Sequence, residues 1–222
     1  DAQIIQPFKN GYLLSYPLII QPGASLKLGG DHLYLDAGSG SFIVNRGRLE
    51  VLQSRIGISG QKRQLEGRNV QYRPFIISWA GSTTRIEASD IADLGFPGNL
   101  TNGLTLARHA TQGSNTPDAI LLLRQTHLQN MSTALQLHSA QAELGSVNVV
   151  DTHHDAILSR DSSMHASAMV LDGAHHGSTL RLAGKGCIEI DTSRFKGSQR
   201  PVIEADEFQG YFRLTQSVVS DS

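Results

Sequence analysis

T-A-L-Q-L-H-S-A, at residues 133–140, is followed 22 residues further along the chain by D-A-I-L-S-R-D, at residues 155–161. Apolar residues alternate with polar ones in both segments, which is typical of a short β-strand with one face in a core. Each segment ends on one side chain with useful chemistry, His138 in the first and Arg160 in the second. The offset between them raises the question of whether the two strands lie side by side.

Similar short runs recur along the whole sequence. They begin near residues 41, 74, 103, 134, 156, 178 and 201, so the later spacings are close to 22 residues and the earlier ones are longer. This period predicts an all-β fold, a right-handed parallel β-helix with three short strands in each rung of about 22 residues. We expect a single β-helix domain over residues 1–222, with loop insertions near residues 60–73 and 108–118.

An antiparallel sandwich or barrel is the alternative fold, because it also has short strands at regular spacing. Hairpin dipeptides such as Asn-Gly are rare between adjacent runs, which argues against antiparallel pairing. Parallel stacking explains the common period more simply. No long segment with a 3.6-residue hydrophobic period interrupts the pattern, so few helices are expected.

The amino-acid composition excludes several classes of function. The 222 residues include 19 basic and 20 acidic side chains, a formal net charge of −1. A generic nucleic-acid binder would show a basic excess, so we expect no nucleic-acid partner. Cys187 is the only cysteine, which excludes a disulfide framework and a Cys-based zinc site. The sequence has neither a phosphate-binding loop nor a Gly-x-Ser-x-Gly elbow, and we expect no cofactor.

Membrane and targeting signals are also missing from the sequence. Its apolar runs are far too short to span a bilayer. It shows no signal peptide at Asp1, so we expect any targeting segment or membrane anchor to lie outside it.

Strand periodicity places His138 and Arg160 relative to each other. Neighbouring rungs of a parallel β-helix are about 4.8 Å apart, and equivalent positions stack in columns. If Leu135 and Leu137 face the core, Gln136 and His138 face outward. The same register turns Arg160 outward, so His138 and Arg160 are predicted neighbours in one outward column.

Further residues are expected in the same column. It should continue to Trp79 on one side, through Ala107 with Arg108 beside it, and to Leu182 on the other side. Trp79 could stack on a sugar ring or belong to the core. Arg108 is a candidate contact for a carboxylate, although most single surface arginines are simply solvated.

An imidazole beside a guanidinium has two interpretations. The pair can be an ordinary surface contact, or it can act on an anionic substrate. Arg can hold a carboxylate through two parallel hydrogen bonds and so make the proton α to that carboxylate more acidic. His can then remove the proton. In a uronic acid this proton is on C5, and its removal leads to epimerisation or to β-elimination.

Three blocks of sequence carry a family resemblance. They are G-S-F-I-V-N-R-G-R-L-E-V-L-Q-S-R-I (40–56), R-P-F-I-I-S-W-A-G-S-T-T-R-I (73–86) with S-D-I-A-D-L-G-F (89–96), and H-D-A-I-L-S-R-D-S-S (154–163). Together they resemble the periplasmic mannuronan C5-epimerases of alginate biosynthesis, over roughly residues 12–165. The resemblance implies a right-handed β-helix, a periplasmic or otherwise extracytoplasmic location and an anionic polysaccharide as partner.

The resemblance also implies roles for single residues. In that family a His within an Asp-Pro-His-Asp motif is the proposed base, and an Arg at the end of a strand neutralises the substrate carboxylate. These roles fall on His138 and Arg160. Gln136 and Ser139 occupy the positions of the two aspartates, and Gln136 is a candidate substrate contact. His154 matches a His of the family and is another.

Two histidine pairs, His153-His154 and His175-His176, are also 22 residues apart. Stacked pairs of this kind could bind a transition metal. Alternate strand residues point in opposite directions, however, so each pair offers at most one nitrogen to a shared site. We therefore expect no metal site and interpret His153, like His154, as a candidate substrate contact.

These observations support three functional hypotheses. The first is a mannuronan C5-epimerase-like isomerase with His138 as base and Arg160 as carboxylate clamp. The second is a non-catalytic polysaccharide-binding or structural β-helix, with membrane or secretion-complex partners outside this sequence. The third is a polysaccharide lyase that uses the same pair of residues.

Overall fold

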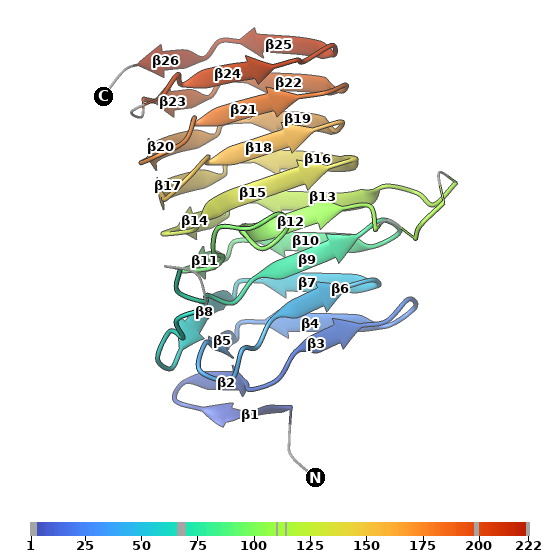
Figure 1. Cartoon of the computed structure of the whole chain (residues 1–222), viewed down its shortest axis with the longest axis vertical. Coiled ribbons are helices and arrows are strands. Elements are labelled where there is room, and N and C mark those ends of the chain that lie inside the picture. The colour runs from blue at the N-terminus through green and yellow to red at the C-terminus, as the bar shows by residue number, and fades with distance from the viewer. Residues whose placement is uncertain (1–3, 66–69, 110, 114, 198–199, 221–222) are drawn as a thin grey trace.

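The computed structural model describes residues 4–65, 70–109, 111–113, 115–197 and 200–220. Its strands wind into a β-solenoid, with one rung stacked on the next from the N-terminal to the C-terminal end (Figure 1). The predicted all-β parallel β-helix is confirmed. No described segment forms a helix of the length and hydropathy needed to cross a membrane.

Three sheets form the sides of the solenoid, and we name them A, B and C. Sheet B contains β3 (Leu18–Ile20), β6 (Ile43–Asn45), β9 (Ile76–Trp79), β12 (Gly103–Ala107), β15 (Thr133–His138), β18 (Ile157–Arg160), β21 (Leu180–Ala183) and β24 (Ile203–Asp206). Sheet C contains β4 (Ser25–Gly29), β7 (Arg48–Leu52), β10 (Thr83–Glu87), β13 (Ala119–Arg124), β16 (Ala140–Gly145), β19 (Ser163–Ser167), β22 (Cys187–Asp191) and β25 (Tyr211–Thr215). Each strand pairs in parallel with the equivalent strand of the next rung.

Sheet A forms the third side and begins with an exception to parallel pairing. It contains β1 (Ile5–Phe8), β2 (Gly11–Leu14), β5 (His32–Asp36), β8 (Arg55–Ser59), β11 (Asp90–Ala92), β14 (His127–Gln129), β17 (Asn148–Thr152), β20 (Val170–Ala174), β23 (Arg194–Lys196) and β26 (Val218–Ser220). β1 pairs antiparallel with β2 and covers the edge of the first rung (Figure 1).

The core lies inside the solenoid and consists of stacked aliphatic side chains. In sheet B, for example, Leu104, Leu135, Ile157 and Leu180 are directly paired between rungs and almost fully buried. Burying one such side chain contributes roughly 1.5–3 kcal/mol, so the column favours this register strongly. A slip by one residue would turn the outward polar residues into the core.

A single residue in the left-handed region turns the chain at each corner from sheet C to sheet A. In the first corner this residue is Gly30, with φ 75°, and in the others φ lies between 47° and 55°, at Gln53, Ala88, Gln125, Ser146, Ala168, Thr192 and Gln216. The next residue is often a buried serine or threonine whose hydroxyl donates to the carbonyl two residues earlier, as Ser89 does to Glu87 (2.7 Å). The repeated corner keeps every rung in step with its neighbours.

Three segments lengthen the early rungs. Residues 60–75 lie between β8 and β9, residues 93–102 between β11 and β12, and residues 108–118 between β12 and β13. The second and third of these lie beside the outer face of sheet B, where they contact its side chains.

Candidate functional site

The outer face of sheet B brings His138 and Arg160 together. They are direct partners in the parallel ladder between β15 and β18, as predicted from the 22-residue offset. The same outward column contains Trp79 and Ala107, which pair between β9 and β12. We call the outward series Arg46, Trp79, Ala107, His138 and Arg160 the axial column.

The prediction that Leu182 continues this column is wrong. Ala183 is the partner of Arg160, whereas Leu182 pairs with Ser159 and is buried in the core. The turn before β21 contains one residue more than the turn before β18, which shifts the register by one position.

The surroundings of His138 favour the neutral form of its imidazole. It is half-buried, and burial lowers the pKa of its imidazole below the ordinary value of 6.5. The positive charge of Arg160 lowers this pKa further, whereas Asp161 acts in the opposite direction. A neutral imidazole of this kind has one N–H donor and one lone pair.

Gln136 decides which nitrogen carries that lone pair. Its Nε2 lies 2.7 Å from His138 Nε2 and donates to Asn99 O at 2.8 Å. Its Oε1 accepts from Asn102 Nδ2 at 3.0 Å and from Thr105 Oγ1 at 3.3 Å. These partners fix the orientation of the amide, so its N–H points at His138 Nε2. His138 Nε2 is therefore the acceptor, and Nδ1 carries the proton.

The loop of residues 93–102 covers Gln136. Gln136 lies on the outer face of sheet B, as predicted, but it is only 3% exposed. Asn99 and Asn102 of the loop contribute the hydrogen bonds described above. Gln136 thus contacts His138 and the loop instead of facing solvent, and direct contact with a substrate stays a prediction.

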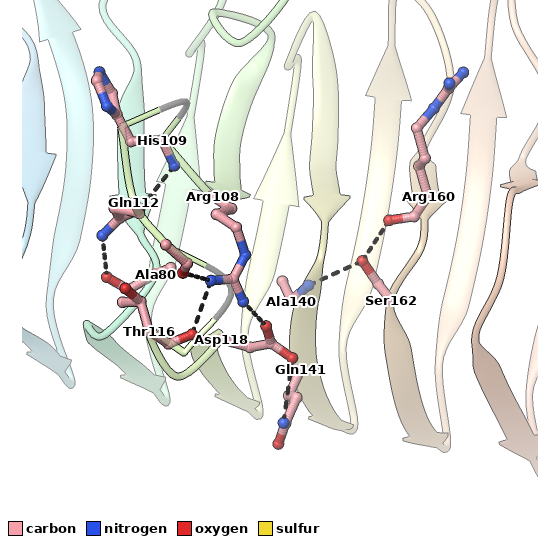
Figure 2. A network of polar contacts seen from close by, with 11 residues as sticks. Ala80, Arg108, His109, Gln112, Thr116, Asp118, Ala140, Gln141, Arg160 and Ser162 are labelled. Carbon is pink, nitrogen blue, oxygen red and sulfur yellow. Dashed lines mark hydrogen bonds and ion pairs between the residues drawn. The ribbon is translucent and has the colours of Figure 1, made fainter.

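Arg160 is an exposed cation next to this buried network. Its carbonyl accepts from Ser162 Oγ at 2.7 Å, while its side chain extends away from the strand (Figure 2). Within the part of the chain that the structure describes, its guanidinium has no carboxylate partner. Arginines on other faces lie 2.8–3.9 Å from a carboxylate: Arg48, Arg55, Arg85 and Arg124. Arg160 is thus available to an external anion.

An open pocket of about 320 Å³ lies on the same face, and its lining includes neither His138 nor Arg160. Its lining includes Leu158 of β18, His154 and Asp155 from the turn before it, and Gly98 from the loop of residues 93–102. Burial raises the pKa of Asp155, and the Ser178 N–H that it accepts at 2.8 Å acts in the opposite direction. His154 therefore lines this pocket together with Leu158, and its contact with a substrate stays a prediction.

His153 lies apart from this pocket. It is exposed at the corner between sheets A and B, and its ring centroid is 6.4 Å from that of His175. Burial and then Arg73 are the main causes that lower its pKa. The described residues contain no group of three or more His, Cys, Asp or Glu side chains arranged to hold a metal ion.

Trp79 and Arg108 belong to a second region of the face. Trp79 is half-buried and meets the ring of His109 edge-on, with centroids 4.9 Å apart. Arg108 donates to Gly113 O and Thr116 O, both at 2.8 Å, and pairs with Asp118 at 2.7 Å (Figure 2). The Arg108 guanidinium thus forms its hydrogen bonds within its own loop. Contact of Trp79 or Arg108 with a substrate stays a prediction.

Comparison with curated proteins gives one group of relatives. The chain is 26% identical over 109 residues to the mannuronan C5-epimerase AlgG of Azotobacter vinelandii, which is 46% of this chain and 20% of that protein. This chain is distantly similar to the mannuronan C5-epimerases. The enzyme of Pseudomonas aeruginosa gives the same identity over 104 residues, 45% of this chain and 19% of that protein. The chain thus spans about a fifth of the length of these relatives. No protein-family model matches it.

Solved structures show the same fold. A crystal structure of a mutant of the periplasmic alginate epimerase AlgG covers 97% of this chain and 59% of that chain, with TM-score 0.72 and 12% identity. Another crystal structure of that epimerase covers 99% of this chain and 80% of that chain, with TM-score 0.57 and 9% identity. At these identities the likeness shows the β-helix fold alone. The aligned sequence is shorter than residues 12–165, the span over which the motifs resemble the family.

Proposed function

We propose that this β-solenoid acts on a uronate-containing polysaccharide as a C5-epimerase-like protein, with the outer face of sheet B as its site. The observation that carries the proposal is the direct pairing of His138 with Arg160 between β15 and β18. One is a half-buried neutral imidazole, and the other is an exposed guanidinium. The distant similarity to mannuronan C5-epimerases supports the same class of substrate.

The proposed chemistry divides the work between the two side chains. Arg160 binds the uronate carboxylate through two hydrogen bonds and stabilises the charge that develops on it. His138 takes the C5 proton, and the electron pair of the C–H bond moves into the carboxylate system. A proton delivered from solvent water to the opposite face of C5 inverts that carbon, and His138 then releases the abstracted proton to solvent. Because the pKa of His138 is lowered, its base form persists from neutral pH to below pH 6.5.

Proton abstraction requires a change at Gln136. The lone pair of His138 Nε2 is engaged by the Gln136 N–H in this structure. The C5 proton can reach that nitrogen only after the hydrogen bond breaks. Since a net hydrogen bond contributes about 0.5–1.5 kcal/mol, substrate binding can supply the energy needed to break it.

The same contact favours a second candidate function, binding without turnover. With Gln136 in place, His138 presents its Nδ1–H donor and Arg160 its guanidinium, and both can hold a uronate without removing a proton. A binding module of this kind would act within a larger membrane or secretion assembly. Because relatives of known structure are described as periplasmic, we place either function outside the cytoplasm.

Product analysis separates these functions. The protein is incubated with polymannuronate, and proton NMR follows the signals of guluronate, the C5 epimer. We expect guluronate to accumulate with the wild type and to fall at least about 100-fold with His138→Gln or Arg160→Gln, since a general base and a group that stabilises developing charge each contribute about 10²-fold or more. A rise in ultraviolet absorbance from an unsaturated sugar would instead identify a lyase.

The matched controls make the same two substitutions, His to Gln and Arg to Gln, on another face of the solenoid. His165→Gln and Arg85→Gln change residues on the outer face of sheet C, where His165 pairs with Glu189 and Arg85 with Glu87. Both should keep wild-type turnover. Binding of polymannuronate by calorimetry without any product would contradict the epimerase proposal and support the binding module.

A further inference from the structure

A second concave site lies on the same face of the solenoid, on the N-terminal side of His138. It is a pocket of about 270 Å³, whose lining includes Arg46, Trp79, His109 and Gln112. Ile19 and Val44, two aliphatic residues on the outer face of sheet B, complete one wall. This pocket therefore combines an indole, an aliphatic wall and several polar groups, which is typical of a site for a ligand with an apolar face and a charged substituent.

The loop of residues 108–118 holds the opposite wall in place. Gln112 Nε2 donates to Ala80 O at 2.8 Å, and the His109 N–H donates to Gln112 Oε1 at 2.7 Å (Figure 2). Arg108 binds two carbonyls and Asp118 within the same loop. His109 is thereby fixed edge-on against Trp79. A wall braced in this way is formed before the ligand arrives, which reduces the entropy lost on binding.

Donors in the pocket favour an acidic ligand. Arg46 is exposed, and within the described part of the chain its guanidinium has no carboxylate partner, in contrast to Arg48 two residues later. His109 Nδ1 accepts the Thr111 N–H at 3.2 Å, so its Nε2 carries a proton and can donate. Arg46 is well suited to a carboxylate, which it can bind through two hydrogen bonds.

This pocket and the proposed active site lie along the same axial column. Arg46 and Trp79 belong to the axial column with His138 and Arg160, and four rung spacings separate Arg46 from Arg160. At about 4.8 Å for each rung, the backbone positions of the two arginines are about 19 Å apart along the solenoid axis. A ligand that reaches both must be longer than one sugar ring.

We infer that the pocket of Arg46, Trp79 and His109 is a second subsite for an acidic sugar of the same polysaccharide chain. Trp79 stacks on the apolar face of the sugar ring, and Arg46 binds its carboxylate. The polysaccharide then runs along the axial column, parallel to the solenoid axis. This inference rests on the proposed function, because both subsites take sugars of one uronate polymer.

The fluorescence of Trp79 tests the inference directly, since it is the only tryptophan of the chain. Oligomannuronates of increasing length are titrated while tryptophan emission and its quenching by acrylamide are followed, and calorimetry gives the affinities. We expect long oligomannuronates to shift the emission and protect Trp79 from acrylamide. A neutral manno-oligosaccharide of equal length should do neither.

Arg46→Gln provides the quantitative test. It should weaken the binding of long oligomannuronates about tenfold and leave that of the shortest binding oligomer unchanged, because one charged hydrogen-bonding contact contributes about 1.5 kcal/mol or more. Arg48→Gln removes the same charge from sheet C and should have no effect.

Two outcomes separate this inference from the proposed function. Binding that depends on Arg160, with unchanged Trp79 emission and no effect of Arg46→Gln, would overturn the second subsite and leave the proposed function standing. Binding that depends on Arg46 and not on His138 or Arg160 would support the subsite and overturn the proposed function.

Discussion

Gln136 donates a hydrogen bond to His138 Nε2 from an amide that three other groups hold in place. A carboxylate at position 136 would accept a hydrogen bond from that nitrogen, whereas the amide donates one. The hydrogen bond at one ring nitrogen of a histidine sets the proton on the other. At the scale of a single residue, the side chain at position 136 therefore determines whether His138 Nδ1 presents a hydrogen-bond donor or a lone pair to a ligand.

Gln136→Glu should reverse this choice. The carboxylate favours a proton on His138 Nε2, so it raises the pKa of His138 and leaves the lone pair on Nδ1. NMR titration of the histidine ring protons measures the pKa, and nitrogen chemical shifts identify the protonated nitrogen. We expect a higher pKa, a change from the Nδ1–H to the Nε2–H form, and faster exchange of the C5 proton of polymannuronate.

Two variants serve as controls for this substitution. Gln129→Glu adds the same charge at an exposed position of β14 and should leave the titration of His138 unchanged. Arg160→Gln removes a nearby positive charge, so it should raise the pKa of His138 without changing which nitrogen carries the proton. An Nε2–H form already present in the wild type would contradict the hydrogen-bond assignment.

Among the structural elements, the corners between sheets C and A explain how the strands stay in register. A residue in the left-handed region turns the chain from sheet C to sheet A. The hydroxyl of the next residue forms one hydrogen bond within its own corner and another with the corner of the neighbouring rung. Ser89 Oγ donates to Glu87 O at 2.7 Å and accepts the Ser54 N–H at 3.0 Å. Because these groups are buried, each hydrogen bond replaces one that water would otherwise make.

Ser89→Ala should destabilise the solenoid. It leaves the buried Ser54 N–H without an acceptor, which costs about 1–3 kcal/mol in the free energy of unfolding. Urea denaturation followed by circular dichroism measures this change. Ser167→Ala, at an exposed position of β19, should change the free energy of unfolding by less than about 0.5 kcal/mol. Equal stability of the two variants would show that the corner hydroxyls contribute nothing.

Strands and register were largely predictable from the sequence because alternation and period are local properties. The pairing of His138 with Arg160 follows from two adjacent runs with equal spacing. Ala183 pairs with Arg160 in place of the predicted Leu182, because the turn before β21 is one residue longer than the turn before β18. Nothing in the strand pattern reveals the length of a turn. Apart from Gly30 in the first corner, the corners from sheet C to sheet A carry Gln, Ala, Ser and Thr in the left-handed region, where glycine would have been the recognisable signal.

The candidate site was less predictable because loops from other rungs complete it. Gln136 donates a hydrogen bond to Asn99 and accepts one from Asn102, and both bonds join residues more than thirty positions apart. His109 and Gln112 likewise reach Trp79 and Ala80 from a distant loop. Periodicity assigns a strand residue to a face, but it says nothing about which loop folds over that face.

At the scale of the whole molecule, sheets B and C differ in how the charged side chains of one outward column are arranged. Sheet C carries an outward series of Lys27, Glu50, Arg85, Leu122, Glu143 and His165, in which Glu50 lies between two cations. On the axial column of sheet B, Arg46 and Arg160 have no carboxylate partner among the described residues. A solenoid with a net charge of −1 thus keeps two free cations on one line, as the recognition of an anionic polymer requires.

Incorporation of deuterium at C5 tests the central claim most directly, because it reports proton abstraction before any product accumulates. Polymannuronate is incubated with the protein in heavy water, and NMR measures the C5 proton signal. We expect the wild type to replace this proton with deuterium and His138→Gln and Arg160→Gln to leave it in place. A C5 proton signal that persists with the wild type, or that disappears equally fast with both variants, would contradict the claim.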